Sequence, residues 1–543
     1  MNRLHVLLFF LPLLAAGQKS TPASQAARDA SQRPALVVVI SIDQFKADYG
    51  EWYLNQWNGG LKRLFTEGAW YSSAMLDYAS SETGPGHATL STGSFPHTHG
   101  ILGNEWVDPK SRNDVYCVAD SLAKPVDGLG GGMSARNLVV TALGDWLKAS
   151  SKNSKVVSLS IKDRAAILMG GKKPDHVYWY DRKTGKLVTS SAYAASTVPW
   201  MKTFNDQNWV FRNVPPVWSR LLPDSVYRGP DDQRGESLWN GSTTMPKVFN
   251  LAQRAEQMAG TPWGDLLILD AARAAIDGEQ LGKSNVTDLL MLSLSSTDYV
   301  GHAYGGHSHE MQDHLARIDA ALGQFLAELE QKFGRDRILV ALSADHACLP
   351  LPEYLQDVEY RFARRLNVQT EVRPKAAAVD SLLRREFGVA EPLFTSNGFI
   401  NYEAAARAHV QPRVLDRRIG EGLRAIDGIA DVYFKFELMD ASIPTRPFLE
   451  RFRNSYYPPR GEDFQIRFIE FALPSSRGVG TSHGSCYDYD NHVPIVFWGP
   501  RYTVNRITRP VRSVDLSITI ANLLKLKPPK TVDGAALREV LPK

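Results

Sequence analysis

The sequence contains little cysteine and almost no excess charge. Its 543 residues include three cysteines, and 62 basic residues stand against 58 acidic ones, which gives a formal net charge of +4. An odd count of three cysteines excludes a disulfide-rich scaffold and allows at most one intrachain bridge. A net charge this small for the length, without a basic block interleaved with aromatic residues, argues against a protein that binds nucleic acid or another polyanion.

The sequence also lacks internal repeats, and its N-terminal apolar run is too short to anchor it in a membrane. Residues 4–14 are apolar but are interrupted by Pro12, whereas a membrane span needs about 20 apolar residues. The run follows Arg3 and precedes small residues, which is typical of a secretory signal peptide. We therefore expect a signal peptide at 1–17, a flexible leader at 18–32, no stable membrane anchor, and export to the periplasm or the medium.

Short apolar runs alternate with helical patterns along the rest of the chain. The clearest helix runs from Met311 to Gly334, because apolar residues recur there at steps of three and four, and a strand follows it directly. This succession is a βαβ unit, and the whole pattern predicts an α/β protein, a three-layer α/β/α sandwich within residues 33–543. Two long stretches, at about 178–285 and 350–475, break the rhythm and are interpreted as insertions that cap the sheet edge. Further helices are expected at about 60–66, from Thr83, at 138–147 and at 514–526.

Three apolar runs end in an aspartate, and histidines stand beside two of them. The runs are LVVVISID, LLMLSLSSTD and ILVALSAD, which end at Asp43, Asp298 and Asp345 and are accompanied by His302 and His346. Ligands of open α/β sheets bind beyond the carboxyl ends of the strands, so we expect these side chains to meet at one edge. Carboxylate and imidazole groups bind divalent metals, and the sequence therefore predicts a metal site there.

A site for two metal ions needs roughly seven converging ligands, and those residues supply five of them. His483, shortly before the apolar run VPIVFWG, is the natural sixth ligand. His307 and His309 are close enough in sequence to compete with His302. Taken singly, an aspartate after a strand is often a helix cap, so the prediction depends on the joint pattern.

A nucleophile is expected in the segment SSETGPGHATLSTG. Thr83 stands there at a predicted helix start, and the glycines after it let backbone N–H groups face an anion. A threonine hydroxyl is a weak nucleophile at neutral pH but can be ionised by metal coordination. Ser80 and Ser81 are the local competitors, and the alternative role of Thr83 is that of a helix cap.

Several motifs in a fixed order carry a family resemblance. They are TGPGHATLSTG, GNEW, DYVGHAYG, SADH and TSHG, within about residues 36–534. In this combination the chain resembles the alkaline phosphatase superfamily, specifically the type I phosphodiesterase/nucleotide pyrophosphatase-like group and its phosphate-irrepressible alkaline phosphatases. The resemblance implies an alkaline phosphatase-like sandwich and two zinc ions per chain.

The resemblance also implies roles for individual residues. It assigns one zinc ion to Asp298, His302 and His483, and the other to Asp43, Asp345, His346 and the oxygen of Thr83. Thr83 would attack phosphorus in line and form a phosphothreonine, which water would then hydrolyse.

The expected substrate class depends on three candidate phosphate contacts. A phosphate monoester carries more charge and more free oxygens than a diester, so a monoesterase gains from additional cationic donors. Arg164 can donate a bidentate pair of hydrogen bonds, Lys162 supplies a point charge, and Asn104 in GNEW can donate to a third position. The Lys-x-Arg pair resembles that of the monoesterase branch, so we predict a metal-dependent phosphomonoesterase that acts on small phosphate monoesters.

Other functions remain open at this stage. A phosphodiesterase or nucleotide pyrophosphatase would use the same scaffold, and an inactive relative that only binds phosphate would keep the fold. A sulfatase is disfavoured, because it would need a formylglycine precursor in a C/S-x-P-x-R setting, and the segment that begins at Thr83 lacks the arginine. The oligomeric state is open, and a monomer is favoured.

Two local features differ from the usual pattern of the relatives. Ala347 follows the Asp-His pair where a glycine is usual, and the cysteines at 348 and 486 are unusual at their places. If His346 and His483 converge on one metal site, the two thiols that follow them also come close together. A Cys348–Cys486 disulfide is therefore a hypothesis.

Overall fold

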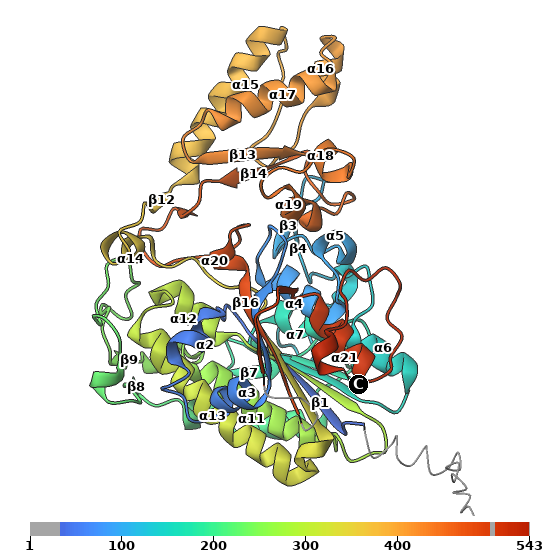
Figure 1. Cartoon of the computed structure of the whole chain (residues 1–543), viewed down its shortest axis with the longest axis vertical. Helices are drawn as coiled ribbons and strands as arrows, with labels where there is room; N and C mark the ends of the chain where they lie inside the picture. The colour runs from blue at the N-terminus through green and yellow to red at the C-terminus, as the bar shows by residue number, and fades with distance from the viewer. Residues whose placement is uncertain (1–32, 500–504, 542–543) are drawn as a thin grey trace, which may run out of the picture. The chain divides into compact units, whose positions relative to one another are not determined.

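A ten-stranded, mostly parallel sheet forms the centre of the protein (Figure 1). The computed structural model describes residues 33–499 and 505–541, and Pro34–Lys543 form one compact unit. The strands are β1 (Leu36–Ile42), β2 (Ala69–Met75), β5 (Val156–Ser160), β6 (His176–Asp181), β7 (Lys186–Val188), β10 (Asp288–Leu294), β11 (Ile338–Ser343), β16 (His492–Trp498), β17 (Asn505–Ile507) and β18 (Val511–Arg512). Their order is β17-β2-β16-β11-β1-β10-β5-β6-β7, with β18 paired to β2. The antiparallel pairs are β11 with β16, β16 with β2, and β6 with β7.

Strand β1 lies between β10 and β11 and contributes to two hydrophobic cores. Its sequence, LVVVISI, is rich in β-branched residues, which favour an extended chain, and every residue of the strand is buried. Val38 and Ile40 belong to one core, whereas Val37 and Val39 belong to the other. Because side chains alternate across a strand, both faces of the sheet must be covered by apolar layers.

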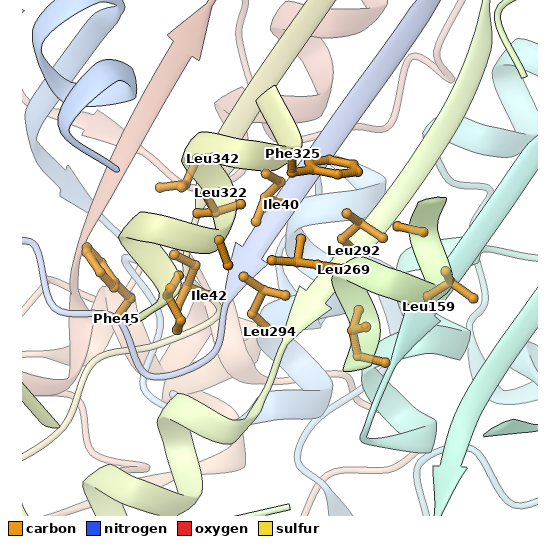
Figure 2. Close-up of a cluster of buried hydrophobic side chains, with 14 of the residues drawn as sticks. Ile40, Ile42, Phe45, Leu159, Leu269, Leu292, Leu294, Leu322, Phe325 and Leu342 are labelled. Atoms are coloured by element: carbon orange, nitrogen blue, oxygen red, sulfur yellow. The ribbon is translucent and has the colours of Figure 1, made fainter. Parts of the chain in front are cut away.

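Helices supply those layers, which confirms the predicted three-layer α/β/α sandwich (Figure 1). One face is covered by α3 (Gly60–Glu67), α11 (Pro262–Gly278) and α13 (His309–Phe333), and the other by α4 (Thr83–Thr92), α6 (Leu143–Ser150), α7 (Asp163–Gly170) and α21 (Asp515–Leu523). Figure 2 shows Ile40 and Leu292 of the sheet in the same cluster as Phe325 of α13.

The predicted amphipathic helix before β11 is confirmed as α13. The hydroxyl oxygen of Ser308 caps its N-terminus by accepting a hydrogen bond from the backbone N–H of Met311, and Gly334, with φ of +79°, ends it. Helix α6 differs from the expectation, because it begins at Leu143 and not at residue 138. The Asp145 carboxylate accepts a hydrogen bond from the backbone N–H of Ala142, which fixes the start of the helix there.

The stretch 178–285 is only in part an insertion, which corrects the boundary expected from sequence. Strands β6 and β7 extend the central sheet, and α11 packs on it through buried residues such as Leu267 and Leu269. The Trp- and Pro-rich composition of this stretch concealed these elements, because long polar segments lie between β7 and α11. Between β7 and α11 the chain forms α8 (Pro199–Asp206), α9 (Trp209–Asn213), α10 (Arg254–Met258) and the short pair β8 (Val217–Trp218) and β9 (Lys247–Val248).

The stretch 350–475 has a hydrophobic cluster of its own, around residues such as Leu415 and Val432. It contains α14 (Pro352–Asp357), β12 (Arg364–Leu366), α15 (Arg373–Phe387), α16 (Tyr402–Arg407), α17 (Pro412–Arg424), β13 (Ile429–Phe434), α18 (Lys435–Met439), α19 (Leu449–Ser455), β14 (Phe464–Phe468) and β15 (Ala472–Pro474). Strand β12 pairs with β15, and β13 with β14. We refer to residues 350–475, which the sequence predicts to cap the sheet edge, as the cap segment.

None of the helices in the described parts of the chain combines the length and apolar character that crossing a membrane requires. The predicted signal peptide (1–17) and the expected flexible leader (18–32) lie outside the described residues.

Candidate active site

Three buried aspartates lie at one edge of the sheet, where β1, β10 and β11 end. Asp43 and Asp345 follow β1 and β11, and Asp298 lies in the first turn of α12 (Ser296–Tyr304), which follows β10. The three strands are parallel neighbours, so their carboxyl ends meet. The ammonium group of Lys162 joins two of the aspartates, with Nζ 2.8 Å from Asp43 Oδ2 and 2.6 Å from Asp298 Oδ2.

Two groups of side chains at this edge are spaced as cation ligands. One group is Asp298, His346 and His483, the other is Asp43, Asp345 and His346, and the ligand atoms within each lie no more than 4.8 Å apart. His346 belongs to both groups. The two groups are therefore adjacent and share the imidazole ring of His346.

His302 lies one helical turn after Asp298, and its Nε2 is 3.2 Å from Asp298 Oδ1. It belongs to neither of the two ligand-spaced groups among the described residues. Its Nδ1 lies 2.8 Å from the carbonyl oxygen of Thr481, and Nδ1 of His483 lies 2.8 Å from that of Ser81. A carbonyl oxygen only accepts, so each Nδ1 is the N–H donor, and each Nε2 is the ring nitrogen that faces Asp298.

Three ligand atoms of the second group have no hydrogen-bond partner in the structure. They are Asp43 Oδ1, Asp345 Oδ2 and His346 Nε2, all of them buried. His346 Nε2 is 3.4 Å from each of the two carboxylate oxygens. A buried polar atom without a partner is costly, and a divalent cation coordinated by all three would satisfy them at once. The residues present therefore fit a cation.

Burial and neighbouring charges shift the pKa values of three side chains at the site. Burial, and then the neighbouring carboxylate of Asp345, raises the pKa of Asp43. Burial also opposes ionisation of Asp298, but His302 and Lys162 lower its pKa well below the ordinary value. Burial lowers the pKa of His346 to about 3, so its ring is neutral and available as a ligand.

The hydroxyl group of Thr83 faces the two basic side chains predicted to bind phosphate. Thr83 is the first residue of α4 and is 1% exposed. Its Oγ1 accepts hydrogen bonds from Lys162 Nζ at 3.3 Å and from Arg164 Nη2 at 3.4 Å. Asn104 lies beside it, where its Oδ1 accepts the backbone N–H of Gly84 at 2.8 Å. The hydroxyl is thus held between cationic donors at a helix N-terminus.

Gly86 allows α4 to approach the carboxylates closely. A Cβ atom at this position would lie 2.3 Å from the backbone oxygen of Asp345. The glycine of the Thr-Gly-Pro-Gly segment is therefore required by close approach to β11 and its following loop.

The residues that the sequence offered as alternatives to Thr83 and His302 have other partners in the structure. Ser80 and Ser81 donate their hydroxyl protons to the carbonyl oxygens of Leu102 and Ser485. His307 stacks on Tyr354 with ring centroids 3.9 Å apart, and Nδ1 of His309 lies 3.3 Å from Asp231. Neither histidine belongs to the ligand-spaced groups found in the described residues.

Two buried residues at the site were not anticipated from sequence. Gln44, with φ of +65°, donates its backbone N–H to Asp345 and its Nε2 to Asp298 Oδ1 at 2.6 Å. His87 directs Nδ1 to the carbonyl oxygen of Thr83 at 2.8 Å, and this atom also lies 3.2 Å from Asp345 Oδ2. The only sequence signal for His87 is its place one helical turn after Thr83.

Arg164, predicted to bind phosphate, is held by a tyrosine and an aspartate. Tyr116 donates its hydroxyl proton to Asp163 Oδ1 at 2.5 Å and accepts a hydrogen bond from Arg164 Nη1 at 3.5 Å. Asp163 also accepts the backbone N–H of Arg164. This arrangement fixes the guanidinium group beside Thr83.

The disulfide considered between Cys348 and Cys486 is not formed in the structure. All three cysteines are free and buried. The Cys348 thiol donates instead to the carbonyl oxygen of Leu349. Burial raises the pKa of the Cys348 and Cys486 thiols, so neither is predisposed to react as a thiolate.

Comparison with known proteins agrees with this geometry. The profile of the family described as type I phosphodiesterase / nucleotide pyrophosphatase matches residues 37–391. The chain is 32% identical over 531 residues to alkaline phosphatase PafA from Elizabethkingia meningoseptica, covering 94% of this chain and 95% of that protein. It is also 32% identical over 526 residues to alkaline phosphatase PhoV from Synechococcus elongatus, with 94% and 93% covered.

The fold agrees as well. The crystal structure of wild-type PafA matches with a TM-score of 0.85 and 31% identity, covering 94% of this chain and 99% of that one. The resemblance stated from the sequence motifs is thereby confirmed. The chain belongs to the type I phosphodiesterase/nucleotide pyrophosphatase family, within the branch of the phosphate-irrepressible alkaline phosphatases.

Proposed function

We propose that this protein is a metal-dependent phosphomonoesterase that hydrolyses small phosphate monoesters through a phosphothreonine at Thr83. The observation that carries this proposal is the position of Thr83 Oγ1, which accepts hydrogen bonds from both Lys162 and Arg164 beside two cation-type ligand groups. The named activity of relatives that span nearly the whole chain supports it.

Two zinc ions per chain are proposed as the cofactor. The residues that would hold one ion are Asp298, His302 and His483, and those that would hold the other are Asp43, Asp345, His346 and Thr83. Mixed carboxylate and imidazole ligands suit zinc, and the unpartnered buried atoms of the second group support a cation there. When bound, such ions would lower the pKa of the threonine hydroxyl and stabilise the departing alkoxide.

The chain's own residues would position the ester and transfer its phosphoryl group, first to Thr83 and then to water. Thr83 Oγ1 attacks phosphorus, a bond from Oγ1 to phosphorus forms, and the bond to the ester oxygen breaks so that the alcohol departs. Water then cleaves the phosphothreonine, which returns the hydroxyl group and releases phosphate. The proximity of Thr83 to fixed cationic donors reduces the rearrangement that this step needs.

Preference for monoesters rests on two cations near Thr83, the buried Lys162 and the half-buried Arg164. The neighbouring carboxylates of Asp298 and Asp43 raise the pKa of Lys162 against the opposing effect of burial, so its ammonium group stays charged. Arg164, held by Tyr116, offers a planar pair of donors. A monoester dianion gains more from these charges than a diester monoanion does. A phosphodiesterase on the same scaffold is the alternative, which a rate comparison of an aryl phosphate with a methyl aryl phosphate tests.

Export to the periplasm or the medium is proposed from the N-terminal segment, with 1–17 as a signal peptide. Residues 350–475 are proposed to act as a cap, and a monomer is the favoured state.

A purified protein that turned over the methyl aryl phosphate faster than the aryl phosphate would contradict the monoesterase proposal.

A further inference from the structure

A cavity of about 320 Å³ adjoins the candidate active site. It is lined by residues next to the nucleophile and the ligand groups, including Glu82, which precedes Thr83, and His483. Its other walls come from the cap segment, including Phe452 and Leu473. The cavity therefore extends from the side of the site formed by Glu82 and His483 to the cap segment.

The walls of this cavity are aromatic and apolar. Trp106 and Phe452 are each 6% exposed, and Tyr487, Leu349 and Leu473 are also buried. Planar apolar surfaces of this kind favour a planar apolar occupant, because ring contacts add to the area that is buried. The volume lies at the small end of the range for ligand pockets, which fits one ring or two fused rings.

Contacts behind the walls hold the rings in place. The Phe452 ring stacks on Tyr433 with centroids 4.2 Å apart, and the Arg460 guanidinium lies 5.0 Å from the centroid of Trp106. Arg467 donates hydrogen bonds to the hydroxyl groups of Tyr433 and Tyr487, at 3.1 and 2.9 Å. Walls that are already fixed lose little freedom on binding, which favours affinity.

The charges that line the cavity disfavour an anionic occupant. Four lining residues are acidic, and they are Glu82, Glu105, Glu462 and Asp490. Arg467 is the one arginine among the described lining residues, and its donors already face two tyrosines. A second phosphate or carboxylate on the leaving group would therefore lack a cationic partner here.

We propose that the cavity receives the leaving group of aryl phosphate monoesters, as a neutral ring system of one or two rings. This proposal rests on the proposed phosphomonoesterase function and assigns it a substrate class. The phosphoryl group would lie at Thr83, and the ring would lie between Trp106 and the cap residue Phe452.

The test compares phenyl phosphate with 2-naphthyl phosphate, whose leaving groups have similar acidity but differ by one ring. In the wild-type holoenzyme we expect kcat/KM for the naphthyl ester to be higher by about tenfold, as expected when one more apolar group enters a pocket. Ala472 lines the cavity and is buried, so Ala472→Leu should reduce this ratio to about one. Phe452→Ala, which removes one wall, should reduce the ratio as well.

Leu415→Ala is the matched control, because Leu415 is buried in the cap segment and does not line the cavity. It should leave the ratio unchanged, which separates loss of the pocket from loosening of the cap. Glycerol phosphate, which has no ring, should be hydrolysed by Ala472→Leu within about twofold of the wild-type rate.

The two ways of failing are distinguishable. A wild-type protein without turnover of any monoester would overturn the proposed function and this assignment together. A wild-type protein that hydrolyses all three esters, with a naphthyl-to-phenyl ratio that neither cavity variant changes, would overturn the aryl pocket alone.

Discussion

The imidazole rings of His346 and His483 are stacked, with centroids 3.5 Å apart and 19° between their planes. One ring follows β11 and the other precedes β16, and these strands are antiparallel neighbours in the sheet. Asp298 lies beside His483, and Asp43 lies beside His346. The stacked rings therefore connect the two ligand groups.

Replacing the nucleophile should remove activity without removing the cations. We expect Thr83→Ala to lower kcat for an aryl phosphate by about 10³-fold or more, since a covalent mechanism has no other hydroxyl in this position. Metal content measured on the same preparation should stay near the wild-type value, because the remaining ligands are unchanged. Near-normal turnover by this variant would rule out the phosphothreonine route.

Removing both cations that are proposed to bind phosphate should affect monoesters more than diesters. A hydrogen bond to a charged group contributes about 1.5–3 kcal/mol, so Lys162→Ala with Arg164→Ala should lower monoester kcat/KM by roughly 10²-fold or more. The loss for a methyl aryl phosphate should be less than about tenfold, since it carries one charge fewer. Equal losses for the two substrates would refute the reason given for monoester preference. Lys172→Ala, on the surface after α7, is a suitable control.

Metal removal should destabilise the protein as well as inactivate it. Without a cation the buried atoms Asp43 Oδ1 and Asp345 Oδ2 have no hydrogen-bond partner, and the carboxylates repel each other. We expect chelation to abolish turnover and to lower the Tm, and Zn²⁺ to restore both. The Asp43→Asn variant should lose less Tm on chelation than the wild type, because the repulsion is already reduced.

The role of His302 is decided by metal counts. The family resemblance includes it among the ligands, whereas the spacing in the structure groups Asp298 and His483 with His346. If His302 is a ligand, His302→Ala should hold about one metal ion fewer than the wild type. His307→Ala, which alters a stacked histidine outside the ligand groups, is the control. A full metal content in His302→Ala would favour His346 as the shared ligand.

A buried acidic pair, Glu236 and Glu310, should make stability depend on pH. Burial, and then the nearby carboxylate of Glu310, raises the pKa of Glu236 from 4.5 to about 9. The native state therefore binds this proton more tightly than the unfolded chain does, so the stability it contributes is present below pH 4.5 and is lost as the pH rises toward about 9. Glu236→Gln keeps the neutral form at every pH, and its Tm relative to the wild type should rise between pH 5 and pH 9.

Glu403→Gln, at an exposed position on α16, serves as the control for that experiment. A Tm difference between Glu236→Gln and the wild type that stayed constant from pH 5 to pH 9 would contradict the prediction.

The sequence predicted the sheet edge well because its signals are local. Apolar runs that end at Asp43, Asp298 and Asp345 report burial and strand termination directly, and the parallel order brings them together. The βαβ unit was equally clear from the spacing along α13. The fold class and the family are confirmed, whereas the ligand assignments remain predictions.

The missed features depend on contacts between distant segments. Gln44 bridges two aspartates only because its backbone adopts a positive φ beside Gly301, where a Cβ would meet the Gln44 side chain. No local sequence pattern indicates such a contact. Likewise, the place of His346 in both ligand groups is visible only in three dimensions. The start of α6 differs from these, because a local contact sets it, the capping carboxylate of Asp145.

The order of the site residues along the chain has a consequence for biosynthesis. Asp43 leaves the ribosome early, but His483 is made only after the cap segment, and β16 must then insert between β2 and β11. A chain stopped before His483 lacks one imidazole of the stack and cannot complete the cluster. Uptake of a cation by the group that includes His483 would therefore report that synthesis and assembly of nearly the entire polypeptide have finished.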